Sequence, residues 1–235
     1  MTAPGLAVVT GASRGIGAAT ARALAAAGWH VVLLARGAAA LRDVAAAIGD
    51  AARPIPCDLA DGAAVHAAVE RLLADAGVPA LLVNNAGLFP LGAVGELPLA
   101  EAERSLAVNL LAPYRLLHLL LPAMREAGRG HVVTIGSIAD RHAFPGNGAY
   151  AAGKFGARAL HEVVRLEVQG TPLRASLVSP GPVDTPIWDP IDPDHRPGFT
   201  PRARMLAPEA VADAVCWVAS RPADVNIDEL RLTHR

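Results

Sequence analysis

The stretch TGASRGIG, residues 10–17, follows a short apolar run and precedes an apolar segment with helical spacing. It has two interpretations. In the first, residues 11–15 form a G-x-S-x-G turn in which Ser13 is the nucleophile of a hydrolase. In the second, they form a glycine-rich turn whose backbone N–H groups bind a phosphate at the start of a helix. The two interpretations predict different enzymes.

The place of this turn in the sequence favours the phosphate-binding interpretation. In α/β hydrolases, a loop upstream of the nucleophile donates an N–H group to the oxyanion hole, and only ten residues precede Gly11. Glycines at 11, 15 and 17 permit a tight turn, close approach of the backbone to a pyrophosphate, and close packing of helix on strand. The spacing G-x-x-x-G-x-G differs from the standard dinucleotide fingerprint, so other residues must support the assignment.

Apolar runs typical of strands alternate with longer segments of helical spacing along the whole chain. This alternation predicts an α/β fold in which a parallel sheet is covered by helices on both faces. Because no break in composition divides the sequence, we expect one domain over residues 1–235, with a Rossmann-like, doubly wound, seven-stranded parallel sheet. The expected strands are 6–10, 31–35, 54–57, 81–84, 131–137, 174–179 and 226–232, and the expected helices are 16–27, 38–48, 62–76, 99–126, 149–169 and 208–219.

One long segment lacks regular periodicity. Residues 180–201, PGPVDTPIWDPIDPDHRPGFTP, contain seven prolines and four aspartates. A long irregular segment in a compact fold is usually functional, so we expect a substrate lid at about residues 182–207. A passive surface loop is the alternative.

Composition excludes several classes of protein. The chain is 52% hydrophobic with a formal net charge of −1, so it has neither the low hydrophobicity of a disordered chain nor the basic excess of a nucleic-acid-binding protein. No secretory signal is visible, and charge, proline or asparagine interrupts each apolar stretch, so we expect a cytoplasmic protein without a membrane span. Cys57 and Cys216 are expected to be buried, and neither they nor the histidines have the spacing of a metal site.

Tyr150 and Lys154 lie at positions i and i+4 of an expected helix and therefore on the same face. Lys154 is the only lysine among 21 basic residues. This bias indicates a position at which arginine cannot replace lysine. Lowering a tyrosine pKa from about 10 to about 7 requires roughly 4 kcal/mol. One cation about 4–5 Å away supplies about 3–4 kcal/mol at an effective dielectric near 20. The pair therefore predicts an acidified phenol, with a chance surface pair as the alternative.

Several further polar residues follow strands or lie within apolar helices. Ser137 ends an expected strand, where parallel sheets bind ligands, although it can also be a simple turn residue. Together, TGxxxGIG at 10–17, NNAG at 84–87, Asn109, Ser137, Tyr150, Lys154 and Pro180-Gly181 resemble the ordered motifs of the classical short-chain dehydrogenase/reductase (SDR) family. The resemblance covers nearly the whole chain.

The resemblance implies a role for each matching residue. Tyr150 is expected to be the general acid/base on the substrate oxygen, and Ser137 to orient that oxygen. Lys154 is expected to lower the phenol pKa, with help from an oxidised nicotinamide, and to bind the nicotinamide ribose. Asn109 is expected to hold a water in a proton relay. The expected cofactor-binding residues are Gly11, Ser13, Arg14, Gly15, Ile16, Gly17, Arg36, Asp58, Leu59, Asn85, Ala86, Gly87, Tyr150, Lys154, Pro180, Gly181, Val183 and Thr185.

The end of the second expected strand indicates which nicotinamide cofactor binds. NAD-preferring dinucleotide folds place an acidic residue there to bind the ribose 2′-hydroxyl. This chain has Ala35 followed by Arg36 at that place, with Arg14 in the glycine turn as a second cation. Two arginines without a carboxylate favour the 2′-phosphate of NADP(H) over NAD(H), unless both face water. Asp58 resembles the family's adenine-contacting acid, and a helix cap is its alternative role.

The expected activity is hydride transfer between NADP(H) and a carbonyl or secondary alcohol of a small substrate: a ketone, aldehyde, hydroxy acid or hydroxy amino acid. Asp140 and Arg141 stand where polar recognition is possible. The C-terminal VNIDELRLTHR lacks the glycines of ketoacyl reductases, which disfavours that alternative. A non-catalytic NADP(H) redox sensor is a second alternative. By resemblance, we expect a homodimer or homotetramer built on the helices that hold Asn109 and Tyr150.

Overall fold

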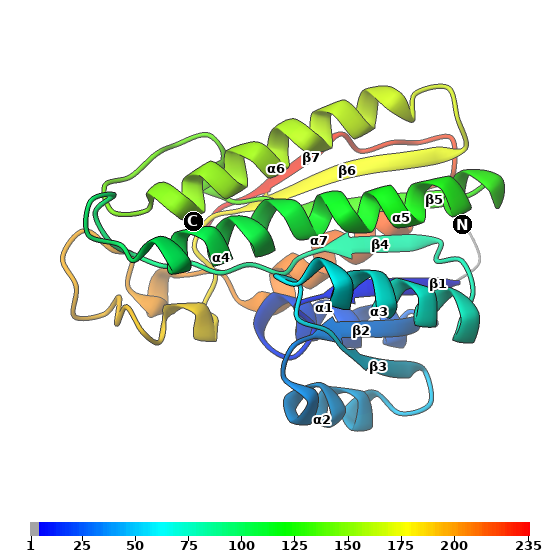
Figure 1. Cartoon of the computed structure of the whole chain (residues 1–235), viewed down its shortest axis with the longest axis horizontal. Coiled ribbons are helices and arrows are strands. Elements are labelled where there is room, and N and C mark those ends of the chain that lie inside the picture. The colour runs from blue at the N-terminus through cyan, green and yellow to red at the C-terminus, as the bar shows by residue number, and fades with distance from the viewer. Residues whose placement is uncertain (1–4) are drawn as a thin grey trace.

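The computed structural model describes residues 5–235 and contains one seven-stranded, entirely parallel sheet (Figure 1). The strand order is β3-β2-β1-β4-β5-β6-β7, as expected for a doubly wound sheet. The predicted fold class is therefore confirmed. The strands are β1 Leu6–Thr10, β2 His30–Ala35, β3 Ala52–Pro56, β4 Leu81–Asn84, β5 Gly130–Ile135, β6 Leu173–Pro180 and β7 Glu229–Leu232.

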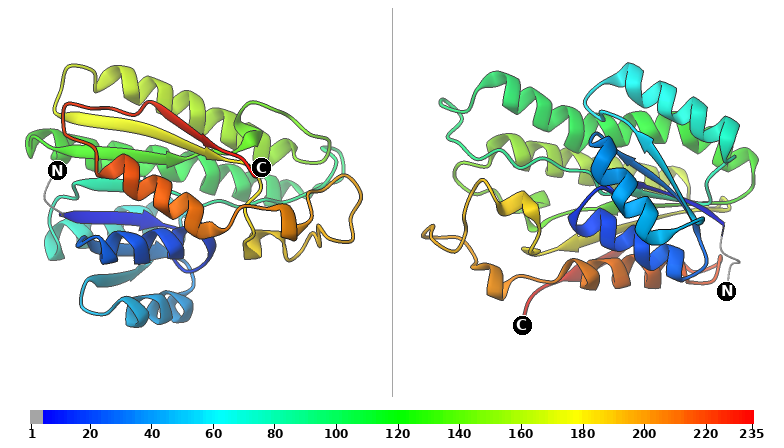
Figure 2. Two further views of the ribbon diagram at one scale, coloured as in Figure 1. Left: turned by 180° about the vertical axis from the view of Figure 1, so that it is seen from behind. Right: turned by 90° about the horizontal axis from the view of Figure 1, so that it is seen from below.

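Helices cover both faces of this sheet (Figure 2). One core joins α1, α2 and α7 to the sheet, and the other joins α3, α5 and α6 to its opposite face. Because side chains alternate along a strand, neighbouring residues serve different cores: Val9 lies in the first and Val8 in the second. The helices are α1 Gly15–Ala26, α2 Ala38–Ile48, α3 Gly62–Asp75, α4 Leu99–Leu106, α5 Ala112–Glu126, α6 Gly148–Glu167 and α7 Pro208–Ala219.

The segment expected to be one helix over 99–126 contains a change of helix type. A π-helical turn, Ala107–Leu111, separates α4 from α5, and the N–H of Ala112 donates to the carbonyl of Ala107, five residues back. Pro113 follows and has no N–H with which to continue the regular ladder. Single π turns are frequent at functional sites, and this one carries Asn109.

This continuous helical segment also bears on the expectation that no stretch could span a membrane. Within residues 5–235, Leu99–Glu126 is the one helix that is long and apolar enough to cross a membrane, judged by length and composition only. Its most apolar window has a mean hydropathy of 1.3. A core helix of a soluble protein passes the same test. Here Leu116, Leu120 and Met124 pack into the core against the sheet.

Three strands have a boundary that differs from the sequence prediction by more than one residue. β5 ends at Ile135, so Ser137 lies beyond the strand and begins the 3-10 turn Ile138–Asp140. β3 begins earlier than expected and includes two prolines, which an edge strand tolerates because its outer side needs no N–H donor. β7 begins later than expected, at Glu229.

Candidate active site

The glycine-rich turn joins β1 to α1 in the way that its sequence predicts. Gly11 and Gly15 have φ angles of +65° and +55°, a region that favours glycine. A Cβ on Gly17 would overlap the carbonyl of Gly11, so the helix packs directly on the turn. The N-cap of α1, Arg14, makes no side-chain capping bond. The first N–H groups of α1 are therefore not occupied by their own cap, as an anion site requires.

Thr10 and Asn85 hold the ends of β1 and β4 together beside this turn. The Thr10 hydroxyl accepts from the N–H groups of Asn85 and Ala86 at 2.9 and 3.0 Å and donates to the Val83 carbonyl at 3.2 Å. The Asn85 amide donates to the Thr10 carbonyl at 2.7 Å. These bonds fix the separation of two neighbouring loops at the point where the strand order reverses.

A cleft of about 780 Å³ opens above the carboxyl ends of the strands. It is lined by every predicted catalytic and cofactor-binding residue except Gly17 and Asn109. Gly17 lies behind the turn, where it allows close packing. The cleft continues under the segment 182–207, which lies at the same end of the molecule as the loops after β4 and β5 (Figure 1).

Asn109 is buried behind the cleft and is fully hydrogen-bonded. Its side-chain oxygen accepts from the Leu88 N–H at 3.1 Å, and its amide donates to the Leu88 carbonyl at 2.8 Å and the Ser105 hydroxyl at 2.9 Å. The π turn thereby fixes the loop after β4. Gly87 and Gly153 both pack against Asn109 at positions where a Cβ would crowd it.

Tyr150, Lys154 and Ser137 come together at one end of the cleft. The Lys154 ammonium donates to the Ile135 carbonyl at 2.8 Å and lies 5.8 Å from the centre of the Tyr150 ring. The Tyr150 side chain reaches the Ser137 hydroxyl. The Ser137 hydroxyl also accepts from the Ala139 N–H at 3.1 Å, because Ser137 caps the 3-10 turn.

The protein groups around Tyr150 act on its pKa in the direction opposite to the effect expected of Lys154. Burial raises the pKa of this phenol above its ordinary value, the Ser137 hydrogen bond lowers it in part, and the Asp140 charge raises it further. Burial also lowers the pKa of Lys154 to about 8, against the opposing effect of Asp140. Desolvation of the phenol by the protein therefore favours its protonated form.

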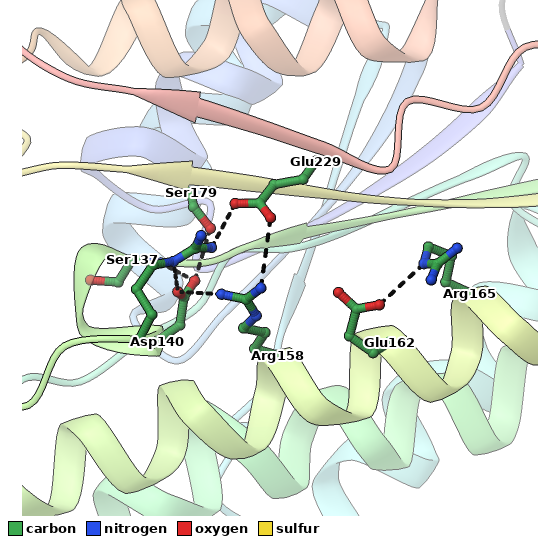
Figure 3. A network of polar contacts seen from close by, with 8 residues as sticks. Ser137, Asp140, Arg158, Glu162, Arg165, Ser179 and Glu229 are labelled. Carbon is green, nitrogen blue, oxygen red and sulfur yellow. Dashed lines mark hydrogen bonds and ion pairs between the residues drawn. The ribbon is translucent and has the colours of Figure 1, made fainter.

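Asp140 is buried beneath the site at the centre of a polar network (Figure 3). Its carboxylate accepts from the Ser137 N–H at 3.1 Å, the Ser179 hydroxyl at 2.8 Å and Arg141 at 2.8 Å. The Arg158 guanidinium lies 3.7 Å from the same carboxylate. Both arginines also pair with Glu229, Arg141 at 2.6 Å and Arg158 at 3.8 Å.

The network changes the role expected for Asp140 and Arg141. Neither lines the cleft, and the guanidinium of Arg141 is occupied by Asp140 and Glu229, so they are not placed to recognise a substrate. Sequence reasoning missed Glu229 and Arg158. No local pattern identifies Glu229 as a partner, because it lies 88 residues from Arg141 in sequence.

The opposite end of the cleft carries the charged residues expected near the adenosine. Arg14, Arg36 and Asp58 all line it. A further residue, Arg104 of α4, binds both oxygens of Asp58 at 2.8 and 3.0 Å and holds the pKa of that carboxyl below its usual value. Arg104 lies 46 residues from Asp58 in sequence, so no local pattern identified it.

Burial affects the thiol groups of both cysteines. Burial raises the pKa of both Cys57 and Cys216 to about 11. Cys57 is buried, whereas Cys216 is only partly so, which corrects the expectation that both are buried.

The parallel order of strands, the glycine turn at the switch point and the hydroxyl–ammonium group above the sheet together define a dinucleotide-dependent oxidoreductase. The sequence profile of the short chain dehydrogenases matches residues 5–196. An oxidoreductase of Mycobacterium tuberculosis, itself uncharacterized, is 39% identical over 233 residues, or 98% of this chain and 91% of that protein. The chain therefore belongs to the short-chain dehydrogenase/reductase family and is one of its oxidoreductases, as predicted.

Other relatives differ in length or in named activity. The glycine betaine reductase ATRR of Emericella nidulans is 34% identical over 236 residues. The matched region covers 98% of this chain but 19% of that protein. Among solved structures, a metagenomic short-chain oxidoreductase in complex with NADP has a TM-score of 0.83, with 36% identity over 98% of this chain and 97% of the other.

Two further structures are named for different substrates. The closed form of serine dehydrogenase with NADP+ has a TM-score of 0.87 and 28% identity, covering 96% of this chain and 93% of the other. Actinorhodin polyketide ketoreductase with NADPH has a TM-score of 0.88 and 28% identity, covering 97% and 95%. These two structures have similar folds and different named activities, so the fold alone does not identify the substrate.

Proposed function

We propose that this chain is an NADP(H)-dependent dehydrogenase/reductase that interconverts a carbonyl and a secondary alcohol on a small molecule. The observation that carries the proposal is the meeting of Ser137, Tyr150 and Lys154 in the same cleft as the glycine turn. When bound, the nicotinamide supplies or accepts the hydride. The chain's own residues bind the dinucleotide, orient the substrate and transfer the proton.

The residues of the cleft fit a phosphorylated dinucleotide. Gly11 and Gly15 adopt positive φ angles that residues with side chains rarely adopt. Because neither carries a side chain, a pyrophosphate can approach the backbone of the turn. Arg14 and Arg36 are exposed at the adenosine end, where they suit a ribose 2′-phosphate. The NADP and NADPH complexes of the similar structures support this preference. Thr185 is buried against Gly15 and belongs to the same site.

Tyr150 is the general acid in the direction of reduction. Its raised pKa keeps the phenol protonated at neutral pH, so it can donate to a developing alkoxide. Ser137 orients the substrate oxygen, and its own place is fixed by the 3-10 turn that it caps. Lys154 supplies a positive charge below the ring. Asn109 fixes the loop at Leu88, and its role in a proton relay stays part of the proposal.

Replacing the phenol tests the proposal. Tyr150→Phe is expected to keep the fold and NADPH binding but to lower kcat by about 10²–10⁴-fold, the usual contribution of general acid–base catalysis. Turnover is followed by NADPH absorbance over a panel of ketones and aldehydes. The matched control is Tyr114→Phe, because Tyr114 is the other tyrosine and is exposed on α5. Equal turnover in both variants would reject Tyr150 as the acid.

The same assay decides between the enzyme and a redox sensor. A sensor would bind NADPH, seen as a change in nicotinamide fluorescence, with no turnover on any carbonyl. The unmodified chain is expected to show both binding and turnover.

We also propose that the chain forms a homodimer or homotetramer through α5 and α6. Large apolar side chains are exposed on these helices at Tyr114, Phe155, Val163 and Leu166. A second copy of the same surface would bury them. Light scattering of the purified protein measures the mass, and a monomer at all concentrations would contradict this assembly. The cytoplasmic location stays a prediction.

A further inference from the structure

The end of the cleft under the segment 182–207, the proposed lid, is called the lid end and is lined by packed aromatic rings. The Phe89 ring lies 4.6 Å from the Tyr150 ring and 5.4 Å from the Trp188 ring, centre to centre. Phe199 continues this row at 6.2 Å from Trp188. Leu91, Phe144 and Ile187 add further apolar surface. Such surface gains free energy by taking apolar groups out of water.

The same end of the cleft has no partner for a charged substrate. Among the described residues 5–235, the charged side chains that line the cleft are Arg14, Arg36, Asp58, Arg104 and Lys154. The first four belong to the adenosine end. Lys154 donates to the Ile135 carbonyl beneath Tyr150. No carboxylate or ammonium of a substrate would therefore meet an opposite charge beside the Ser137 and Tyr150 hydroxyls.

Nearby arginines do not change this conclusion, because each is held elsewhere. Arg141 pairs with Asp140 and Glu229 below the site. Arg202 pairs with Asp184 at 2.6 Å and Asp189 at 2.7 Å on the lid. The Arg196 guanidinium stacks on the Phe199 ring, 5.4 Å from the ring centre. All three guanidinium groups lie outside the cleft lining.

The lid holds its aromatic residues in fixed positions. The Trp188 indole N–H donates to the Val183 carbonyl at 2.9 Å. Arg202 ties the lid turn of Asp189 to Asp184 at its base. The two ends of the segment are also joined, since Val183 and Leu206 form a parallel bridge. Trp188 is therefore a built part of the cleft wall.

From these observations we infer the substrate class, an inference that rests on the proposed function. The substrate is an uncharged ketone, or the matching secondary alcohol, that carries an aryl ring or similarly bulky apolar group against Phe89 and Trp188. Burying an unpaired carboxylate in this apolar end would cost far more than apolar contact returns. Hydroxy acids and hydroxy amino acids are thus disfavoured, despite the similarity of fold to serine dehydrogenase.

A matched pair of substrates tests the inference. Ethyl benzoylformate and benzoylformate present the same aryl ketone, but the first is neutral and the second is an anion. With NADPH, we expect kcat/KM to be at least ~100-fold higher for the ester, because the anion loses its hydration without a partner. Equal reduction of both, or faster reduction of the anion, would overturn the inference while leaving the proposed function intact.

Variants of the aromatic wall give a second readout. Trp188→Ala is expected to raise KM for the ester about tenfold with little change in kcat, since it removes apolar and ring contacts. Trp188→Phe should restore part of the loss. The matched control is Trp217→Ala, because Trp217 is half-exposed on α7 and does not line the cleft. An unchanged KM in Trp188→Ala would contradict the assigned contact.

Failure of the proposed function looks different from failure of the substrate class. If NADPH binds and neither compound nor any smaller neutral ketone is reduced, the reductase function itself is wrong and the inference is overturned with it. If small charged oxo acids are reduced faster than the aryl ester, only the substrate class is wrong.

Discussion

The two ends of the cleft are built by different means. The end proposed to bind the cofactor is formed mainly by backbone: a glycine turn, a helix N-terminus and the paired ends of β1 and β4. The lid end is formed by side chains from the loops after β4 and β5 and from the segment 182–207. Backbone geometry recurs wherever the motif recurs, whereas a side-chain lining can change residue by residue. This difference explains how one fold carries many substrate specificities.

The largest expected effect follows from disturbing the backbone end. Gly17→Ala places a methyl group against the Gly11 carbonyl and the Asn85 amide. Overpacking of this kind costs about 1–3 kcal/mol of unfolding free energy, and NADPH affinity should fall because the turn must move. Thermal unfolding and fluorescence titration measure both. Gly95→Ala is the control, since a Cβ there meets open space; equal behaviour of the two variants would refute the close packing.

The next prediction concerns Asp140, which joins the active-site loop to β7. Asp140→Asn removes the buried carboxylate that pairs with Arg141, but Arg141 keeps Glu229, so the loss of unfolding free energy should stay well below the about 3–5 kcal/mol of a fully broken buried pair. Because the Asp140 charge raises the pKa of both Tyr150 and Lys154, its removal should lower both. Reduction needs a protonated phenol, so the basic limb of its kcat profile should move to lower pH.

The control for this variant is Asp224→Asn, which removes an exposed charge outside the network. A merely structural Asp140 would change the melting temperature and leave the pH profile where it was. The two measurements therefore separate electrostatic positioning from simple stability.

A smaller effect is expected at Arg36. Arg36→Ala should weaken NADPH binding about tenfold relative to NADH, because a hydrogen bond to a charged group contributes about 1.5–3 kcal/mol. Isothermal titration with each cofactor gives the ratio. Arg42→Ala, on the exposed part of α2, is the matched control. An unchanged ratio would show that Arg36 faces water and that the cofactor preference lies elsewhere.

The smallest effect is expected for the pair of Arg104 and Asp58. The pKa of Asp58 is lowered in the folded chain, chiefly by the Arg104 hydrogen bond, so the pair stabilises the fold above the unfolded pKa of Asp58. That contribution is lost as the pH falls through the folded pKa. Since both side chains are about one-third exposed, Arg104→Gln should cost less than about 1 kcal/mol near pH 7 and nothing in strong acid. Denaturant unfolding at the two pH values checks this; an equal loss at both would contradict the ion pair.

Short-range patterns account for most of what the sequence predicted correctly. The alternation of strands and helices predicted the parallel sheet. The glycine spacing predicted the turn after β1, where the strand order reverses. The i, i+4 spacing placed Tyr150 and Lys154 on one face of α6. These features depend on residues a few positions apart, whose geometry is set by the local backbone.

The misplaced predictions involve long-range contacts or burial. Arg141 was expected to be available for a substrate, yet Glu229, 88 residues away in sequence, holds it. The phenol of Tyr150 was expected to be acidified by a neighbouring charge, yet burial raises its pKa. Neither effect has a local signature, because each depends on segments that meet only in the folded chain.

By itself, the sequence determined the family, the parallel sheet, the glycine turn and the set of candidate catalytic residues, because each depends on the spacing of residues close together in the chain. Only the tertiary structure decided which charges are already paired, which way the Tyr150 pKa moves and how apolar the lid end of the cleft is. The physical reason is that desolvation and ion pairing depend on every group nearby in space, and separation along the chain does not indicate which groups these are.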